Sequence, residues 1–159
     1  MIIALLIAIA WPVLNGPATV TGKVVSVIDG NTLEVESPQN GIQKIVLDGI
    51  DAPEPEQEFG TEARIFLEER VLHKIVSLEF RGKDRNGNHI GIVTVGDDDV
   101  RVDLLRGGFA WTVEKNTRDD LEGYRKWAQL KGKGLWKNPG AIAPWVFRRQ
   151  QSMSLPKSS

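Results

Sequence analysis

The sequence predicts an α+β domain, mainly β, in which a five-stranded Greek-key barrel carries about three packed helices. The apolar periodicity gives the order three strands, helix, two strands, helix, helix. Hairpin-length turns join the first three strands, which excludes a layer of parallel strands. The chain of 159 residues is long enough for one domain with a real core, and it has no cysteine, which excludes disulfides and thiolate metal sites.

The five expected strands are short segments rich in β-branched residues, and turn residues bound each of them. Gly30 allows a tight turn between the first and second strands. Asn40-Gly41 and Asn86-Gly87 are strong hairpin signals, because both residues tolerate the positive φ that such turns need. The strands are expected at residues 19–28, 32–37, 42–50, 75–83 and 89–95.

The three expected helices cover residues 61–74, 100–108 and 117–134. In the first, Thr61 is a candidate cap and an apolar stripe faces the core. The second ends at Gly107 or Gly108, because glycine readily terminates a helix. In the third, Thr117 and Asp120 match a capping box. The stripe of the first helix consists of Ala63, Phe66, Leu67 and Val71.

Both ends of the chain differ in composition from the domain, which we place at residues 19–150. Residues 1–18 contain an uncharged apolar run, residues 2–10, which is too short to span a bilayer and is typical of a secretory signal. A basic segment before the run is missing, so a truncated start, an uncleaved interfacial segment and a buried first strand stay open. We expect export to the periplasm or the outside, with tethering if the segment is uncleaved, and a disordered tail at 151–159.

Charge is unevenly distributed along the chain, although the net charge is −1 and the pI about 6.1. Residues 29–62 hold nine acids and one lysine, a net charge of −8, whereas residues 121–159 hold eight bases and one acid, a net charge of +7. The overall charge gives no support to a strongly basic nucleic-acid binder. The two segments are either solvated faces of opposite sign, or a cation-binding part and a polyanion-binding part.

Six short motifs, in order, resemble the thermonuclease (staphylococcal-nuclease-like) family over about residues 19–150. They are "GKVVSVIDGNT", "LDGIDAPE", "FGTEA", "KDRNGN", "LLRGGFAW" and "KGKGLWKNPGAIAPW". The resemblance implies an OB-fold barrel. In active members it also implies calcium-dependent hydrolysis of phosphodiesters in DNA and RNA, with two arginines that hold the phosphate.

The acidic half of the family's site is mostly present. The resemblance implies that Asp51 is a calcium ligand, that the carbonyl of Ala52 is a second ligand and that Glu54 is the catalytic base. Asn31 stands where the family has another calcium carboxylate, and an asparagine offers a neutral oxygen only. Because calcium affinity depends on the number of charged oxygen ligands, we expect weak calcium binding and no other cofactor.

The two arginine positions of the family are occupied by uncharged residues. Val46 stands at the first position, before "GIDAPE", and Asn88 at the second, in "DRNGN". A lysine near such a position supplies a point charge and cannot reproduce the planar, bidentate hydrogen bonding of a guanidinium. We therefore expect impaired catalysis. The neighbours weighed as substitutes are Lys44, Arg81, Arg85 and His89.

The basic C-terminal part is the expected contact for nucleic acid or another polyanion, without sequence specificity. Its candidate residues are Lys126, Lys131, Lys133, Arg148 and Arg149. The tryptophans at 111, 127, 136 and 145 are interpreted as packing residues in preference to a base-stacking platform. We expect a monomer. Three functions stay open: a binding or structural module with a degenerate nuclease site, a weak calcium-dependent endonuclease, and an accessory protein for an extracellular polysaccharide.

Overall fold

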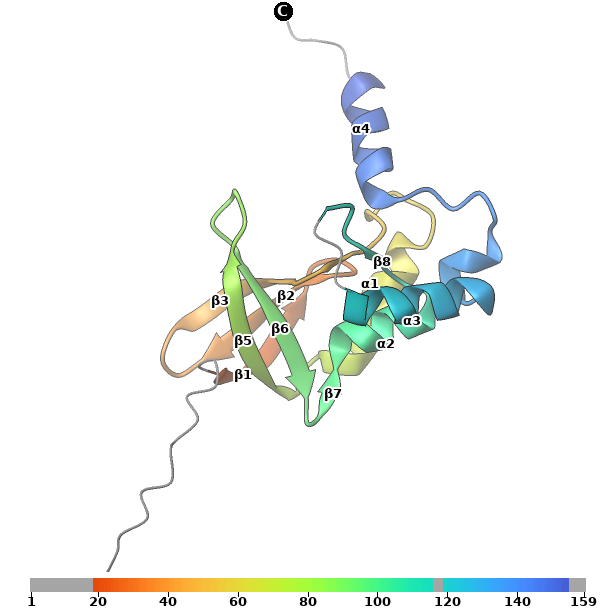
Figure 1. Ribbon diagram of the computed structural model, residues 1–159. Coiled ribbons are helices and arrows are strands. Elements are labelled where there is room, and N and C mark those ends of the chain that lie inside the picture. Colours follow the sequence, from red (N-terminus) through yellow and green to blue (C-terminus); the bar gives the residue numbers. More distant parts are fainter. Residues whose placement is uncertain (1–18, 116–118, 155–159) are drawn as a thin grey trace, which may run out of the picture.

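Five strands form a closed barrel in the computed structural model, which describes residues 19–115 and 119–154 (Figure 1). The sheet order β3-β2-β1-β5-β6 is closed by a further pairing of β3 with β6. That closing pair is parallel, and the other neighbours in the barrel are antiparallel. The five-stranded OB-like barrel is thereby confirmed. Its strands are β1 (Thr19–Val27), β2 (Thr32–Ser37), β3 (Gly41–Leu47), β5 (Ile75–Lys83) and β6 (His89–Val95).

Three further strands are short. β7 (Asp98–Asp99) continues the sheet beside β6, while β4 (Ile50–Asp51) and β8 (Trp111–Thr112) form a separate antiparallel pair. The third expected strand, 42–50, is therefore divided into β3 and β4. The division falls at Gly49, whose φ of 76° turns the chain out of the extended conformation.

The three expected helices are present as α1 (Gly60–Val71), α2 (Val100–Gly107) and α3 (Asp119–Leu130). Gly108, with φ 75°, ends α2 as predicted, and a 3-10 helix, η1 (Gly134–Lys137), follows α3. The prediction that Thr61 caps α1 was wrong. The helix begins one residue earlier, after Phe59 in the left-handed region, and no side chain caps it. The Thr117 cap lies outside the described residues.

A glycine at position 60 is required by the segment that precedes α1. A Cβ atom there would lie 1.9 Å from the backbone oxygen of Glu54. No side chain can be accommodated at that separation, so the chain at 54–59 can fold back tightly onto the first turn of α1 only with glycine. The backbone of Glu54 is thereby held against the first turn of α1.

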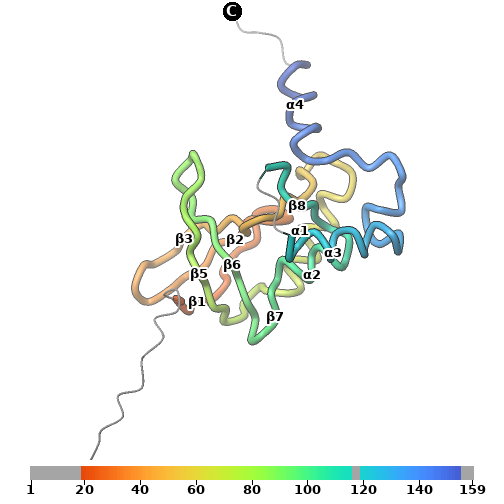
Figure 2. The backbone as a smooth tube through the Cα atoms, viewed as in Figure 1, coloured from red at the N-terminus to blue at the C-terminus, as the bar shows by residue number. Residues whose placement is uncertain are grey.

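A fourth helix, α4 (Pro144–Ser154), was not among the expected elements. It lies on the same side of the barrel as the β5–β6 hairpin, and its C-terminal end points away from the domain (Figure 2). The predicted domain boundary at residue 150 falls inside this helix. The signal-like segment 1–18 and residues 155–159 lie outside the described residues. Among the helices that are described, none is long and apolar enough to cross a membrane.

The core fills the barrel and continues under α1 and α2. In α1, the predicted stripe is confirmed: Ala63, Leu67 and Val71 are fully buried, and Phe66 stacks on Phe109 with ring centroids 4.6 Å apart. The largest fully buried side chains are Leu33, Ile45, Leu47, Leu67, Leu78, Leu104, Leu105 and Leu121.

Gly30, in the β1–β2 turn, connects this core to the predicted site. A Cβ atom on Gly30 would lie 2.6 Å from the Cβ of Ala52 and 2.8 Å from that of Ala63. The turn can therefore pack against both α1 and the segment after β4 only because this residue has no side chain. The close approach fixes Asn31 relative to Asp51.

Candidate functional site

A pocket beside the barrel brings together most of the predicted site residues. The β1–β2 turn, the end of β3, the segment after β4, the β5–β6 hairpin and α4 all contribute to it. Asn31, Val46, Asp51, Ala52 and Glu54 lie together in its wall, whereas Asn88 does not line it. The described lining residues are Asp29, Asn31, Thr32, Val46, Asp51, Ala52, Pro53, Glu54, Pro55, Asp84, Asn86 and Arg148.

Arg148 is the one base among these described lining residues, and it binds both retained carboxylates. Its Nη1 and Nη2 donate to the two oxygens of Asp51, at 3.2 and 2.8 Å. Nη1 also donates to Oε1 of Glu54 at 2.5 Å. The contact with Asp51 has the bidentate geometry that makes arginine–carboxylate pairs strong. Arg148 was predicted as part of a polyanion-binding surface, and the structure places it inside the acidic pocket.

Burial raises the pKa of Asp51 above its ordinary value. The hydrogen bonds and charge of Arg148 oppose this shift, and the carboxylate of Asp29 adds to it. Ionising Asp51 in this desolvated place therefore carries a cost that Arg148 only partly offsets. The same hydrogen bonds, which Arg148 donates to Asp51 and to Glu54, raise the pKa of Arg148, the bond to Asp51 most.

Asn31 is held by its neighbours in the β1–β2 turn. Its backbone N–H donates to Oδ1 of Asp29 at 2.9 Å, and its side-chain amide nitrogen donates to the carbonyl of Ile50 at 3.4 Å. The backbone of Leu47 donates to the carbonyl of Asn31. The turn thus ties together β3 and β4, and it presents to the pocket a residue with no charge.

The two arginine positions have different surroundings. Val46 lies in the pocket wall and pairs with Thr32 on one side and Ile90 on the other, so it puts an apolar side chain there. Asn88 donates from its side chain and its backbone to the carboxylate of Asp84, at 2.8 and 2.9 Å. The Asn88 side-chain bond is the main reason why the pKa of Asp84 lies below its ordinary value. Asn88 therefore stabilises the hairpin.

The basic neighbours of these positions do not line the pocket. Lys44 is exposed opposite Glu34, and Arg81 pairs with Glu79 at 2.7 Å. His89 is bonded to Gln43. Arg85 is exposed in the hairpin. The guanidinium that does reach the pocket comes from the C-terminal helix, far away in sequence.

Asp48, beside the first arginine position, is paired with a buried arginine. Arg101 lies 3.6 Å from the Asp48 carboxylate and donates to its backbone carbonyl at 3.2 Å. The same guanidinium forms a bidentate ion pair with Asp99, at the start of α2. Arg101 therefore anchors the turn after β3, from which the chain enters β4 and the pocket.

The remaining predicted binding residues are separated from the pocket. Lys131 and Lys133 are exposed beyond the end of α3, and Lys126 is exposed and 3.9 Å from Glu122. Arg149 follows Arg148 on α4 and pairs with Glu114 at 3.3 Å. Of the five predicted binding residues, Arg148 alone is among the described residues that line the pocket.

The tryptophans divide into two kinds. Trp111 packs against Trp136 and Trp145, with ring centroids 4.3 and 5.9 Å apart, as expected for packing residues. Trp127 is 43% exposed and, with Tyr124, flanks the guanidinium of Arg106. Trp127 is thus not a buried core residue, and its ring contacts Arg106 of α2.

The described residues do not fit a calcium site of the kind that the family resemblance implies. No group of three or more Asp, Glu or His side chains within residues 19–115 and 119–154 is arranged to hold a metal ion. Asp51 and Glu54 are bonded to Arg148, and Asn31 brings no charge. Calcium needs several hard oxygen ligands, and here the charged ones already have a cation.

The chain belongs to the staphylococcal nuclease family. The family profile described as "Staphylococcal nuclease homologue" matches residues 44–138. A protein of Escherichia coli named "Uncharacterized endonuclease" is 33% identical over 144 residues, which cover 89% of this chain and 92% of the relative. A "Micrococcal nuclease" of Shigella flexneri is 31% identical over 140 residues, covering 80% of each chain. A Haemophilus influenzae protein, also named "Uncharacterized endonuclease", is 32% identical, with 85% and 76% covered.

Proposed function

We propose that this domain is a catalytically impaired member of the nuclease family that serves as a binding module for nucleic acid or another polyanion. The observation that carries the proposal is the composition of the pocket. Val46 contributes no charge at the first arginine position, and the guanidinium that is present binds Asp51 and Glu54. A transition-state arginine in phosphoryl transfer contributes roughly 3–5 decades of rate, so its absence reduces a nuclease to near background.

Binding of a polyanion is assigned to the exposed bases around α3. Lys131 and Lys133 form no ion pair with another described residue, and the guanidinium of Arg106 on α2 lies 5.6 and 5.9 Å from the centroids of the exposed rings of Tyr124 and Trp127. Bases attract the phosphate backbone, and exposed aromatic rings favour stacking with bases. The acidic pocket, in contrast, repels phosphate.

The second candidate is a weak calcium-dependent endonuclease. It is favoured by the presence of Asp51, Ala52 and Glu54 in one pocket, and by relatives that are named endonuclease or micrococcal nuclease. An accessory role with an extracellular polysaccharide rests on the OB-like barrel alone. Export, which the apolar run at 2–10 supports, belongs to the proposal and is tested by cell fractionation.

A cleavage assay separates the first two candidates. We expect single-stranded DNA incubated with the domain and millimolar calcium to be cleaved no faster than with Glu54→Gln, because the phosphate-holding charges are missing. Cleavage by the wild type that Glu54→Gln abolishes would establish the endonuclease and end the proposal.

A binding measurement tests the module itself. In fluorescence anisotropy with a labelled single strand, Lys131→Glu combined with Lys133→Glu should weaken binding and reduce the slope of log affinity against log salt by roughly 1.4. The matched control is Lys23→Glu combined with Lys74→Glu, which reverses the same charge on exposed barrel lysines. An equal loss in both double variants would contradict the assignment to α3.

A further inference from the structure

The cation of the acidic pocket comes from α4, whose first turn packs against the domain. Pro144 is buried, and Trp145 packs on Trp111, which pairs directly with Asp51 in the β4–β8 ribbon. Gln57 donates to the carbonyl of Ile142 just before α4, at 2.5 Å. These contacts position the first turns of α4 independently of Arg148.

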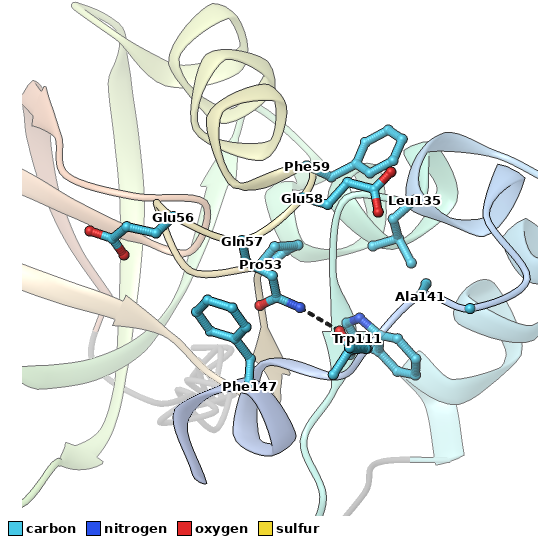
Figure 3. Close-up of a pocket in the computed structure, with 11 residues that line it drawn as sticks. Pro53, Glu56, Gln57, Glu58, Phe59, Trp111, Leu135, Ala141 and Phe147 are labelled. Carbon is cyan, nitrogen blue, oxygen red and sulfur yellow. Dashed lines mark hydrogen bonds between the residues drawn. The ribbon is translucent and has the colours of Figure 1, made fainter. Parts of the chain in front are cut away.

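A small apolar cavity beside the pocket completes this mounting. Figure 3 shows Phe147 on α4 together with Pro53 and Gln57, which belong to the segment that carries Glu54. Phe147 lines this cavity, and Arg148, the next residue in the helix, lines the acidic pocket and reaches its carboxylates. Arg148 therefore belongs to the part of α4 that packs against the domain.

The charge balance of the pocket decides what it attracts. Its described lining includes four carboxylates and one base, a net charge of −3. A phosphate would meet repulsion even with Arg148 in place, whereas a cation would be attracted. Arg148 supplies one positive charge and donates to three of the oxygens that a divalent cation would use.

We propose that Arg148 is the resident cation of this pocket and that a divalent cation binds Asp51 and Glu54 only in competition with it. The inference deepens the proposed function, since it gives a reason for impaired catalysis that is separate from Val46 and Asn88. The ligand class is a hard divalent cation, calcium being the one that the family implies. Binding is weak because the guanidinium must first leave its two carboxylates.

Calcium titration by calorimetry on the full chain, without nucleic acid, tests the competition. Arg148→Gln should bind calcium at least tenfold more tightly than the wild type, since a charge that competes within hydrogen-bond distance is removed. Arg148→Lys keeps the charge and should gain less. The matched control is Arg149→Gln on the same helix, which pairs with Glu114 outside the pocket and should leave calcium affinity unchanged.

Circular dichroism identifies any variant that is not folded; Arg148 is half exposed, so all three variants are expected to fold. Calcium affinity in folded Arg148→Gln equal to or lower than that of the wild type would overturn the inference. An equal gain in Arg149→Gln would do so as well, because it would indicate a general effect of charge. Cleavage by the wild type would contradict the proposed function and leave this comparison of affinities unaffected.

Discussion

Replacing Arg101 by methionine should cost the domain about 3 kcal/mol of unfolding free energy. The Arg101 side chain is 4% exposed, and its guanidinium binds Asp99 in a two-toothed pair and approaches Asp48. Methionine keeps the unbranched apolar stem and removes the charge. Removing one partner of a buried ion pair typically costs about 3–5 kcal/mol. Asp99 and Asp48 are 25% and 22% exposed, so water can partly solvate them and the lower end of that range applies.

Urea denaturation with linear extrapolation measures this loss. For a domain of this size, about 3 kcal/mol corresponds to a fall in Tm of roughly 6–12 °C. The control is Arg64→Met, which breaks an exposed i,i+4 pair with Glu68 and should cost only about 0.3–0.5 kcal/mol. If Arg101→Met and Arg64→Met proved equally stable, Arg101 would not anchor the turn after β3.

Two further predictions concern the site and the response to acid. The triple variant Asn31→Asp, Val46→Arg, Asn88→Arg should cleave DNA with calcium well above the wild-type rate, while each single variant stays near background, because these groups act as a unit. Initial rates on a fluorogenic oligonucleotide measure the difference. A wild type as fast as the triple variant would show that Asn31, Val46 and Asn88 do not limit catalysis. The hydrogen bonds from Arg125 lower the pKa of Glu122, so the stability they confer is present above the ordinary glutamate pKa of 4.5 and is lost as the pH falls below it. Urea midpoints at neutral and acid pH should therefore differ more in the wild type than in Glu122→Gln, and parallel changes would refute this.

The barrel could be predicted because its local signals agree. Alternation of apolar residues, hairpin dipeptides at 40–41 and 86–87, and glycine at 108 act within a few residues of the structure they specify. The start of α1 was predicted less well. There a tight approach of the preceding loop to Gly60, and not a side-chain cap, determines the first turn.

The pocket could be assembled from motifs, but its arginine could not. Asp51 and Glu54 lie in one short segment, so their proximity follows from sequence, whereas Arg148 reaches them through the docking of α4. That helix has no expected boundary in the sequence and depends on Trp145 packing against Trp111. The available signal was the run of apolar and basic residues at 144–149, since a short helix there has apolar side chains that can be buried and arginines that can form ion pairs with carboxylates.

The parallel pairing of β3 with β6 has a consequence for the order of folding. These strands are far apart in sequence, and every other pairing in the barrel can form without this one. Closing a long loop is entropically costly, so non-local pairs of this kind tend to form late. Val46 and the residues after Asn88 meet at this seam. A chain with its other pairings formed and its seam still open would hold the parts of the pocket at the two edges of one open sheet, which makes the pocket an indicator that the barrel has closed.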